Sequence, residues 1–368
     1  MTEQPENIPT NIIKIPDTLL GDIRNMIEET RSAIAVTVNA ELTMLYWRIG
    51  RRISQEILKG TRAKYGEEIV SALARQLTSE YGRGFSGKSL RHMIRFAEAF
   101  ADEKIVSSLM RQLSWTHFLS IIYLPESLQR DFYAEICRME QWSTRTLKNK
   151  IASMLYERTA LSRKPDELAK LELEALREED RMTPDIVFRD PYLLDFLGLK
   201  DVYQEKDLEA AILREMEAFI MELGVGFTFV ARQKRITVDH DDFYLDMLFY
   251  HRDLRRLVAI ELKLDKFRPD HKGQMELYLR WLDKYERKQG EDAPLGIILC
   301  AEKNSERIEL LELGHAGIHV AEYLTVLPPK DVLKRKLHAA IEQSRQALAR
   351  RSETGLTDLP VDAVEVTE

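Results

Sequence analysis

The clearest alternation of hydrophobic and polar positions in the chain lies in its C-terminal half. Two runs, FYLDMLFY at 243–250 and LVAIELKL at 257–264, are rich in Val, Ile, Leu, Phe and Tyr, and the polar stretch HRDLRR separates them. Such runs around a short polar break predict a pair of adjacent strands. Three charged residues interrupt the runs: Asp246, Glu261 and Lys263. Because side chains alternate between the two faces of a strand, Glu261 and Lys263 are expected on one face.

The N-terminal part has a different pattern. From about residue 17 to 160 the hydrophobic residues recur at helical spacing, which predicts a helical region. One helix is expected to begin near Asp17, and a separate long helix to cover 41–58. A further helix is predicted over 143–159, where basic residues outnumber acidic ones. This basic stretch could contact phosphates or form a solvated surface, and the sequence favours neither.

The stretch FSGKSLRHMIRFAEAF follows a glycine-rich turn at residues 82–84. Helical spacing places Lys88, Arg91 and Arg95 on one face of the predicted helix. A short helix with a basic face after such a turn is what a helix-turn-helix or winged-helix domain presents to DNA. A solvated face of an amphipathic helix has the same pattern, so nucleic-acid binding by these three residues is a hypothesis.

Beyond residue 185 strands and helices alternate. The expected order is helix, three strands, helix, strand, helix, strand, which predicts a mixed α/β sheet with helices on both faces. The first strand is GFTFVARQ. The stretch after it, RITVDHDD, is expected to be rich in turns, with Asp239 to Asp242 a solvated turn instead of a metal cluster. The predicted domains are a helical domain over 15–165, a charged linker over 166–185, an α/β domain over 186–326, a helix over 330–352 and a disordered acidic tail over 353–368.

Composition narrows the choice of function only slightly. The chain has 368 residues, a net charge of −7 and two cysteines, Cys137 and Cys300. The charge does not indicate a general nucleic-acid binder, so such binding would need local basic patches. Two distant cysteines favour a reducing compartment over a disulfide scaffold. With neither a signal-peptide pattern nor a long apolar run, the sequence predicts a cytoplasmic protein that does not enter membranes.

The charged residues of the predicted hairpin suggest a specific chemistry. Asp246 and Glu261 lie on neighbouring strands, and paired carboxylates suit Mg²⁺ or Mn²⁺, which prefer oxygen ligands. The backbone carbonyl of Leu262 could add a third ligand. Lys263 could orient or help deprotonate an attacking water and stabilise negative charge in a transition state. This set predicts metal-dependent hydrolysis of a phosphodiester bond. No Walker loop, Rossmann glycine pattern or nucleophile elbow is found.

The order of elements and the Asp, Glu and Lys positions resemble the PD-(D/E)xK nuclease superfamily, which has a restriction-endonuclease-like mixed sheet. In GQMELYLRWLD, Gln274 and Tyr278 are similar to the Gln-x-x-x-Tyr element of RecB-like branches. The resemblance implies a role for Gln274 in catalysis and for Tyr278 in binding nucleic acid. It also implies an acid from the first helix, for which Glu209 is the best match and Glu217 the rival. Gln233 could face the site or lie in a turn.

A narrower resemblance covers most of the chain. The stretches DLEAAILREMEAFIMELGVGFTFVARQ, FRPDHKGQMELYLRWLD, LYWRIGRRI and LSWTHFL are similar to the bacterial YhcG-type family. Its members pair a helical, winged-helix-like N-terminal domain with a PD-(D/E)xK nuclease domain. This implies a Mg²⁺- or Mn²⁺-dependent endonuclease, with DNA favoured over RNA as substrate, in defence or repair. A homo-oligomer or a larger assembly is left open. The alternative is a non-catalytic nucleic-acid-binding adaptor or regulator on a nuclease fold.

Overall fold

The computed structural model describes residues 17–58, 63–199, 203–303, 308, 311 and 313–353. The chain forms two compact units, Met1–Leu124 and Pro125–Glu368, and each is considered by itself. The acidic tail that was predicted to be disordered lies, beyond residue 353, outside the described residues. The predicted domain limits differ from this division, and they stay a prediction.

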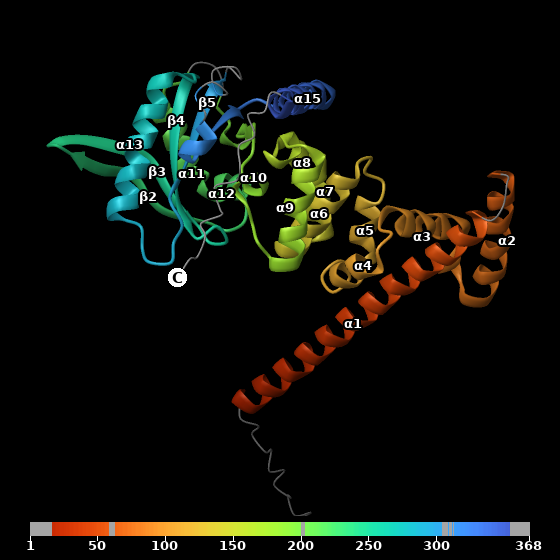
Figure 1. The fold of residues 1–368 in the computed structure, drawn as a ribbon. Coiled ribbons are helices and arrows are strands. Elements are labelled where there is room, and N and C mark those ends of the chain that lie inside the picture. Colours follow the sequence, from red (N-terminus) through yellow and green to blue (C-terminus); the bar gives the residue numbers. More distant parts are fainter. Residues whose placement is uncertain are drawn as a thin grey trace, which may run out of the picture. The chain divides into compact units, whose positions relative to one another are not determined.

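The first unit is helical throughout its described residues (Figure 1). Its elements are α1 (Asp17–Leu58), α2 (Ala63–Tyr81), η1 (Arg83–Phe85), α3 (Gly87–Ala99), α4 (Glu103–Leu109) and α5 (Trp115–Ile121). The two helices expected at Asp17 and over 41–58 are one continuous helix of 42 residues. Neither Gly nor Pro occurs between residues 22 and 49 to interrupt it. The winged-helix likeness stays a prediction.

Helix α3 is held against α1 by a very close crossing. A Cβ atom added at Gly50 of α1 would lie 1.8 Å from the backbone oxygen of Met93, so only glycine fits there. Around the crossing, Leu90 and Met93 of α3 pack with Ile53 of α1 and Val70 of α2. Ser86 caps α3 by accepting a hydrogen bond from the backbone N–H of Ser89 (3.3 Å). The helix predicted over this stretch is confirmed.

The second unit begins with short helices: α6 (Ser127–Met139), α7 (Thr144–Ala152), α8 (Leu155–Arg158), η2 (Leu161–Arg163), α9 (Asp166–Glu179) and α10 (Pro184–Val187). The single helix predicted over 143–159 is wrong, because the chain breaks between α7 and α8, where Met154 has φ of 53°. The break turns Arg158 inward, where its side chain is 1% exposed and pairs with Glu222 at 2.5 Å. Arg158 therefore belongs to the interior and offers no surface to phosphates.

The segment expected to be a charged linker contains α9. Its charged residues surround an apolar stripe, because Ala169, Leu173 and Leu176 recur at helical spacing and are all buried. Arg138 of α6 donates a hydrogen bond to the backbone oxygen of Leu176 (2.9 Å). The segment is thus a packed helix of the second unit.

A six-stranded mixed sheet forms the centre of the second unit, in the order β1-β6-β5-β4-β3-β2. Strands β2, β3 and β4 pair antiparallel, whereas β4, β5, β6 and β1 pair parallel. The elements are β1 (Tyr192–Leu193), η3 (Asp195–Leu197), α11 (Glu205–Arg214), α12 (Met216–Leu223), β2 (Phe227–Val238), β3 (Asp241–His251), β4 (Arg256–Lys266), α13 (Pro269–Tyr285), β5 (Leu295–Glu302), η4 (Leu313–Ala316), β6 (Ile318–Leu324) and α15 (Lys330–Glu353). The predicted hairpin and the predicted sheet class are confirmed; the helix expected over 304–313 lies largely outside the described residues.

Helices cover the two faces of this sheet. Met275 of α13 packs against Gly296 of β5, where an added Cβ would lie 2.6 Å from the Met275 side chain. On the other face, the ring of Phe219 of α12 lies 6.1 Å from that of Phe249 of β3. The sheet is therefore buried on both sides at its centre. Asp246 and Glu261 lie in the middle of β3 and β4, directly beyond the last residues that pair between these two strands.

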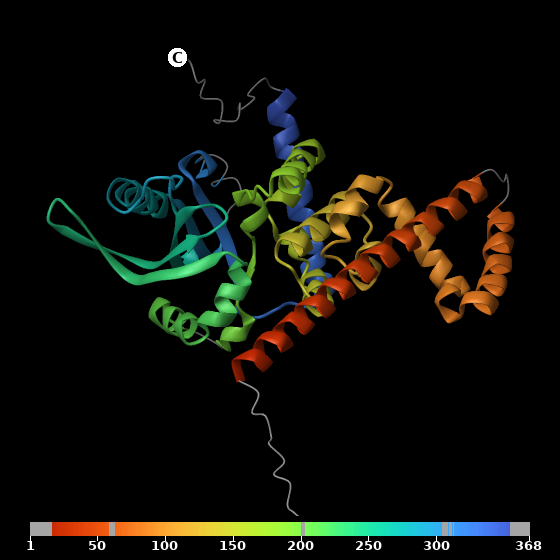
Figure 2. The ribbon, with the colours of Figure 1, turned by 90° about the horizontal axis from the view of Figure 1, so that it is seen from below.

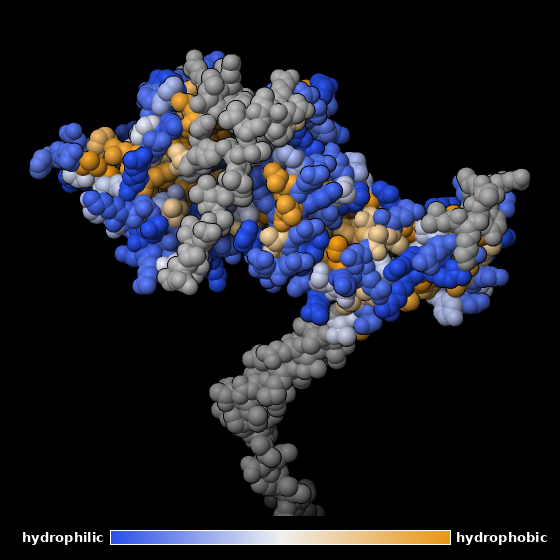
Figure 3. All heavy atoms as spheres, in the orientation of Figure 1, coloured by the Kyte–Doolittle hydropathy of each residue, from blue (hydrophilic) through white to orange (hydrophobic). Residues whose placement is uncertain are grey.

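Strands β2 and β3 extend beyond the sheet as a two-stranded arm (Figures 1 and 2). Pairing of β3 with β4 ends at Met247 and Ile260, but pairing of β3 with β2 continues to Val238 and Asp241. The tip of the arm is hydrophilic, with hydrophobic side chains next to it (Figure 3). The turn predicted over 235–242 is therefore wrong: only Asp239 and His240 form it, and the residues before them are strand.

Among the described residues, no helix is both long and apolar enough to cross a membrane.

Candidate active site

Asp246 lies where strands β3 and β4 stop pairing. The last paired residues are Met247 and Ile260. The backbone N–H of Leu262, two residues further along β4, therefore has no backbone partner in β3. The Asp246 side chain replaces that partner: its Oδ2 accepts a hydrogen bond from the backbone N–H of Leu262 (2.9 Å). The end of the strand pairing thereby fixes one carboxylate beside β4, next to Glu261.

Glu261 is the centre of a hydrogen-bonded cluster. Its Oε1 accepts hydrogen bonds from Nζ of Lys263 and from Nε2 of Gln274, both at 3.0 Å. The sharing of one face by Glu261 and Lys263, predicted from strand alternation, brings these two side chains into contact. Gln274 reaches the site from α13, which follows β4 directly in the chain. We call Asp246, Glu261, Lys263 and Gln274 the carboxylate site.

Tyr278 holds Gln274 in place. Nε2 of Gln274 also donates to the Tyr278 hydroxyl (2.7 Å), which in turn donates to the backbone oxygen of Tyr244 (3.2 Å). Gln274 and Tyr278 lie one helical turn apart, so they contact each other as the sequence spacing predicted. Tyr278 is only 1% exposed. The predicted contact of Tyr278 with nucleic acid is at odds with this burial, because the ring has no surface to offer.

The electrostatics of the carboxylate site favour the binding of a cation. Burial, followed by the nearby Asp246 carboxylate, raises the pKa of Glu261 to about 7, and Lys263 opposes the shift. Burial also raises the pKa of Asp246, against the hydrogen bond from the Leu262 backbone. Two carboxyl groups whose charged forms are both disfavoured lie side by side, and a cation bound between them would relieve that cost.

One oxygen of the site has no partner. Oε2 of Glu261 is buried and accepts no hydrogen bond in the structure. A buried carboxylate oxygen without a donor is costly, and a divalent cation is a partner that matches it. Among the described residues no three His, Cys, Asp or Glu side chains converge into a metal site. Mg²⁺ needs only one or two carboxylates because it retains several waters, so Asp246 and Glu261 fit such an ion.

Glu209 and Gln233 extend the site toward α11. Nε2 of Gln233 donates to Oε2 of Glu209 and to Oδ1 of Asp246, both at 3.0 Å. Glu209, chosen from the sequence over Glu217, is thus the acid brought next to Asp246, whereas Glu217 lines a different hollow. Gln233 was left open by the sequence, since its position at the end of the GFTFVARQ strand was compatible with both a site and a turn. The carbonyl of Leu262 as a ligand stays a prediction.

Of the three basic residues predicted on α3, two are exposed. Lys88 and Arg91 lie on the surface of the first unit, with no hydrogen bond or ion pair to another described residue. Arg95 is engaged: its Nε donates to the backbone oxygen of Ile122 (3.1 Å), and its Nη1 lies 3.9 Å from Glu98. Nucleic-acid binding by this face stays a prediction, and Arg95 has the weakest case for it.

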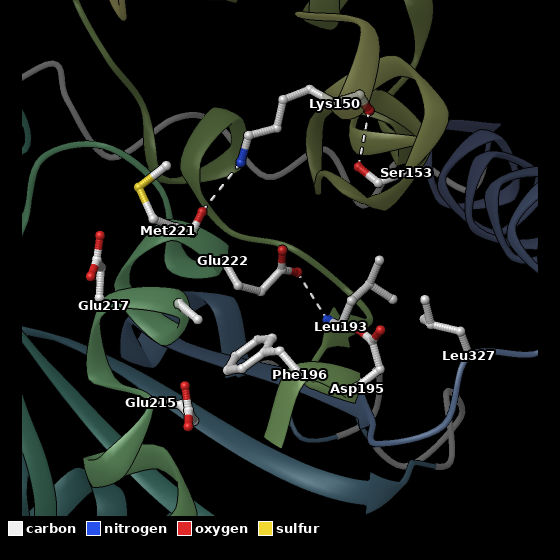
Figure 4. A pocket seen from close by; sticks show the side chains of 11 residues that line it. Lys150, Ser153, Leu193, Asp195, Phe196, Glu215, Glu217, Met221, Glu222 and Leu327 are labelled. Carbon is white, nitrogen blue, oxygen red and sulfur yellow. Dashed lines mark hydrogen bonds between the residues drawn. The ribbon is translucent and has the colours of Figure 1, made fainter. Parts of the chain in front are cut away.

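A hollow of about 600 Å³ lies elsewhere in the second unit (Figure 4). It is lined by Lys150 from α7, by Glu217 and Met221 from α12, and by Phe196 beside β1, and Nζ of Lys150 donates to the backbone oxygen of Met221 (3.2 Å). Burial lowers the pKa of Lys150 to about 8. The hollow shares no lining residue with the carboxylate site. Asp246, Glu261 and Lys263 therefore lie outside the hollow, where the pairing of β3 with β4 ends.

Comparison with known proteins agrees with these observations. The DUF1016 N-terminal domain matches residues 22–158, and the YhcG PDDEXK nuclease domain matches residues 185–338. A protein of Escherichia coli (strain K12) that bears the name "Putative nuclease YhcG" is 33% identical over 346 residues, which is 86% of this chain and 92% of that protein.

Two solved structures share a smaller part of the chain. A repair endonuclease from Pyrococcus abyssi is 24% identical, with 35% of this chain and 50% of that chain covered and a TM-score of 0.24. The EndoMS protein in a complex with double-stranded DNA is 21% identical, with 35% and 48% covered and a TM-score of 0.26. The chain thus spans about half the length of each. By its similarity to the Escherichia coli protein and by its two matching domains, the chain belongs to the YhcG family of nucleases, with a DUF1016 N-terminal domain followed by a PDDEXK nuclease domain.

Proposed function

We propose that this nuclease is an endonuclease that depends on a divalent cation, Mg²⁺ or Mn²⁺, and hydrolyses phosphodiester bonds of DNA. The observation that carries the proposal is the carboxylate site, where Asp246 and Glu261 adjoin and Oε2 of Glu261 is buried without a partner. Asp246 and Glu261 would hold the cation, with the carbonyl of Leu262 as a further oxygen. The bound ion polarises a phosphate and lowers the pKa of a water molecule.

Lys263 is the proposed group at the reacting phosphate. Its ammonium has three N–H donors, and Glu261 accepts one of them. The remaining donors can orient the attacking water and stabilise the charge that develops on the phosphate oxygens. The side chain is 16% exposed, so it is held by its surroundings yet can reach a substrate.

Gln274 and Tyr278 are proposed to act through Glu261. Gln274 fixes the Oε1 atom of Glu261, which leaves Oε2 for the cation. Tyr278 fixes the Gln274 amide and ties it to the backbone of β3. Catalysis depends on groups being held within fractions of an ångström, so these two residues are positioning residues.

Cleavage assays on a panel of substrates test the proposal. Linear, branched and single-stranded DNA and the matching RNAs are incubated with the protein in Mg²⁺, in Mn²⁺ and in EDTA. We expect nicking or cutting of DNA that requires the cation, and a loss of at least about 10²-fold for Lys263→Ala. Lys266→Ala is the matched control: Lys266 lies three residues further along β4 and pairs with Glu302 at 2.8 Å, but at 70% exposure.

Equal cleavage by the wild type and Lys263→Ala would refute the assignment of the site. Tight binding of nucleic acid without any cation-dependent cleavage would instead support the adaptor, in which the nuclease fold serves only as a binding surface. Cleavage of RNA with DNA left intact would retain the mechanism and overturn the choice of substrate.

A further inference from the structure

The amide group of Gln233 lies between two carboxylates that come from different elements. Its single nitrogen is 3.0 Å from Oε2 of Glu209 on α11 and 3.0 Å from Oδ1 of Asp246 on β3. An amide nitrogen has two N–H bonds, and this arrangement uses both of them on acidic oxygens. Lys263, which contacts Glu261, has no hydrogen bond to either of these two acids among the described residues. The position between them is therefore filled by a neutral donor.

The backbone at Gln233 is adapted to this placement. Gln233 has φ of 43°, in the left-handed region that residues other than glycine seldom occupy. Its neighbours Arg232 and Lys234 nevertheless stay paired with Met247 and Leu245 in β3. An unfavourable conformation at one residue inside a regular ladder persists only where its surroundings impose it, and such residues gather at functional sites.

The charges around Nε2 of Gln233 indicate which kind of group could occupy its position. The single nitrogen between Oε2 of Glu209 and Oδ1 of Asp246 holds two acidic oxygens from different elements close to each other. The point between two such oxygens is where positive charge is most favoured. A glutamine amide is nearly symmetric in shape, so a half turn about its last bond exchanges the N–H₂ group for the carbonyl oxygen, which is an oxygen ligand for a hard cation.

We propose that Gln233 is a reversible positioning residue of the carboxylate site. Without a cation its amide nitrogen holds Glu209 against Asp246 and keeps the two acids together. With a divalent cation held at Asp246 and Glu261, a half turn of the amide would present its oxygen toward the ion. Gln233 thus sets both the alignment of the empty site and the affinity for the ion. The inference rests on the proposed function, because it requires that the site binds a divalent cation.

Binding of Mn²⁺ alone, measured by the electron paramagnetic resonance signal of the free ion and by calorimetry, tests the inference without any substrate. Gln233→Lys places an ammonium beside Asp246, one of the two proposed ligands, so we expect the Kd for Mn²⁺ to rise at least tenfold. Gln233→Glu adds a third carboxylate, so we expect a Kd several-fold lower than that of the wild type. In EDTA the order of melting temperature should be the reverse, with the Lys variant above the Glu variant.

Gln346 supplies the matched control. It is exposed on α15, and its amide nitrogen donates to Oε1 of Glu342 (2.8 Å), a single carboxylate. Gln346→Lys and Gln346→Glu should leave the Kd for Mn²⁺ within twofold of the wild type. A purely structural role for Gln233 predicts the same direction of change for its Lys and Glu variants, and that result overturns the inference. Wild-type protein that binds no Mn²⁺ overturns the proposed function and the inference together, whereas binding unaffected by either Gln233 variant overturns the inference alone.

Discussion

In the carboxylate site each charged group is bonded to a second residue, whereas Lys88 and Arg91 on α3 point into solvent without a bond to any other described residue. Glu261 is 4% exposed and is held by two donors from β4 and α13. Interlocked, buried groups act through their exact mutual geometry, so removing one of them should affect rate. Exposed cations act through charge at a distance, so removing one should affect affinity in a salt-dependent way.

Among the variants that distinguish the carboxylate site from the basic residues of α3, Glu261→Gln is expected to have the largest effect on the cleavage rate. This variant should lose cleavage by about 10²- to 10³-fold, which is the size of effect seen when one preorganised polar group is removed. It should nevertheless make the cation-free protein more stable at neutral and alkaline pH, because it removes a buried carboxylate whose Oε2 has no hydrogen-bond partner.

The sign follows from the pKa of Glu261, which is about 7 in the folded protein against an ordinary value of 4.5. The cost of its charged form is absent below pH 4.5, grows between pH 4.5 and 7, and is complete above pH 7. We therefore expect Glu261→Gln to raise the free energy of unfolding by at most about 3 kcal/mol at pH 8, and by little at pH 5. Urea denaturation in EDTA at both pH values measures this.

Two controls sharpen that result. Glu302→Gln alters a carboxylate that is 57% exposed and paired with Lys266, so its effect on the free energy of unfolding should be at most about 1 kcal/mol. Mn²⁺ should raise the stability of the wild type and leave Glu261→Gln nearly unchanged. A Glu261→Gln variant that is less stable than the wild type at pH 8 would show that the network around Oε1 outweighs the cost of the buried charge.

A smaller effect, of a different kind, is expected on α3. We predict that Lys88→Ala combined with Arg91→Ala weakens DNA binding about tenfold and makes the salt dependence of binding shallower by about two counter-ions, with the cleavage rate at saturating DNA unchanged. Binding in Ca²⁺ at several salt concentrations measures both quantities. Arg48→Ala combined with Arg51→Ala removes the same charge from the same unit, where both residues pair with Glu103.

If the control pair weakens binding as much as the α3 pair, net charge accounts for the effect and the basic face has no special role. If neither pair changes affinity, the first unit does not contact DNA. The carboxylate site would then be the one remaining proposed contact with nucleic acid among the described residues.

The carboxylate site could be predicted from the sequence because its parts are local. Asp246 and Glu261 lie on two strands joined by a short turn, and Lys263 follows Glu261 by two positions on the same face. Gln274 and Tyr278 lie one turn apart on the next helix. Spacing along the chain therefore accounts for Lys263 beside Glu261, whereas the roles of Gln274 and Glu209 were expected from the family resemblance.

Three other features were missed, and only the last of them depends on a distant contact. The charged composition of residues 166–179 concealed the buried stripe of α9, since only three of its residues are buried. The arm was mistaken for a turn because Asp239 to Asp242 dominate the stretch, although Ile236 and Val238 alternate with polar residues as in a strand. The inward turn of Arg158 depends on Glu222, which lies 64 residues further along the chain.

The smallest predicted effect concerns Arg95, which the sequence groups with Lys88 and Arg91. In the structure its guanidinium is bonded to the backbone oxygen of Ile122, so it fastens α3 to the end of the first unit. We expect Arg95→Ala to change DNA affinity by less than twofold and to lower the stability of the protein by about 1 kcal/mol, the usual worth of one such hydrogen bond. Arg95→Lys should restore little, because a lysine does not reproduce the geometry of the Nε–H donor. A loss of affinity equal to that of Lys88→Ala would instead place Arg95 among the binding residues and extend the exposed basic face by a full turn of α3.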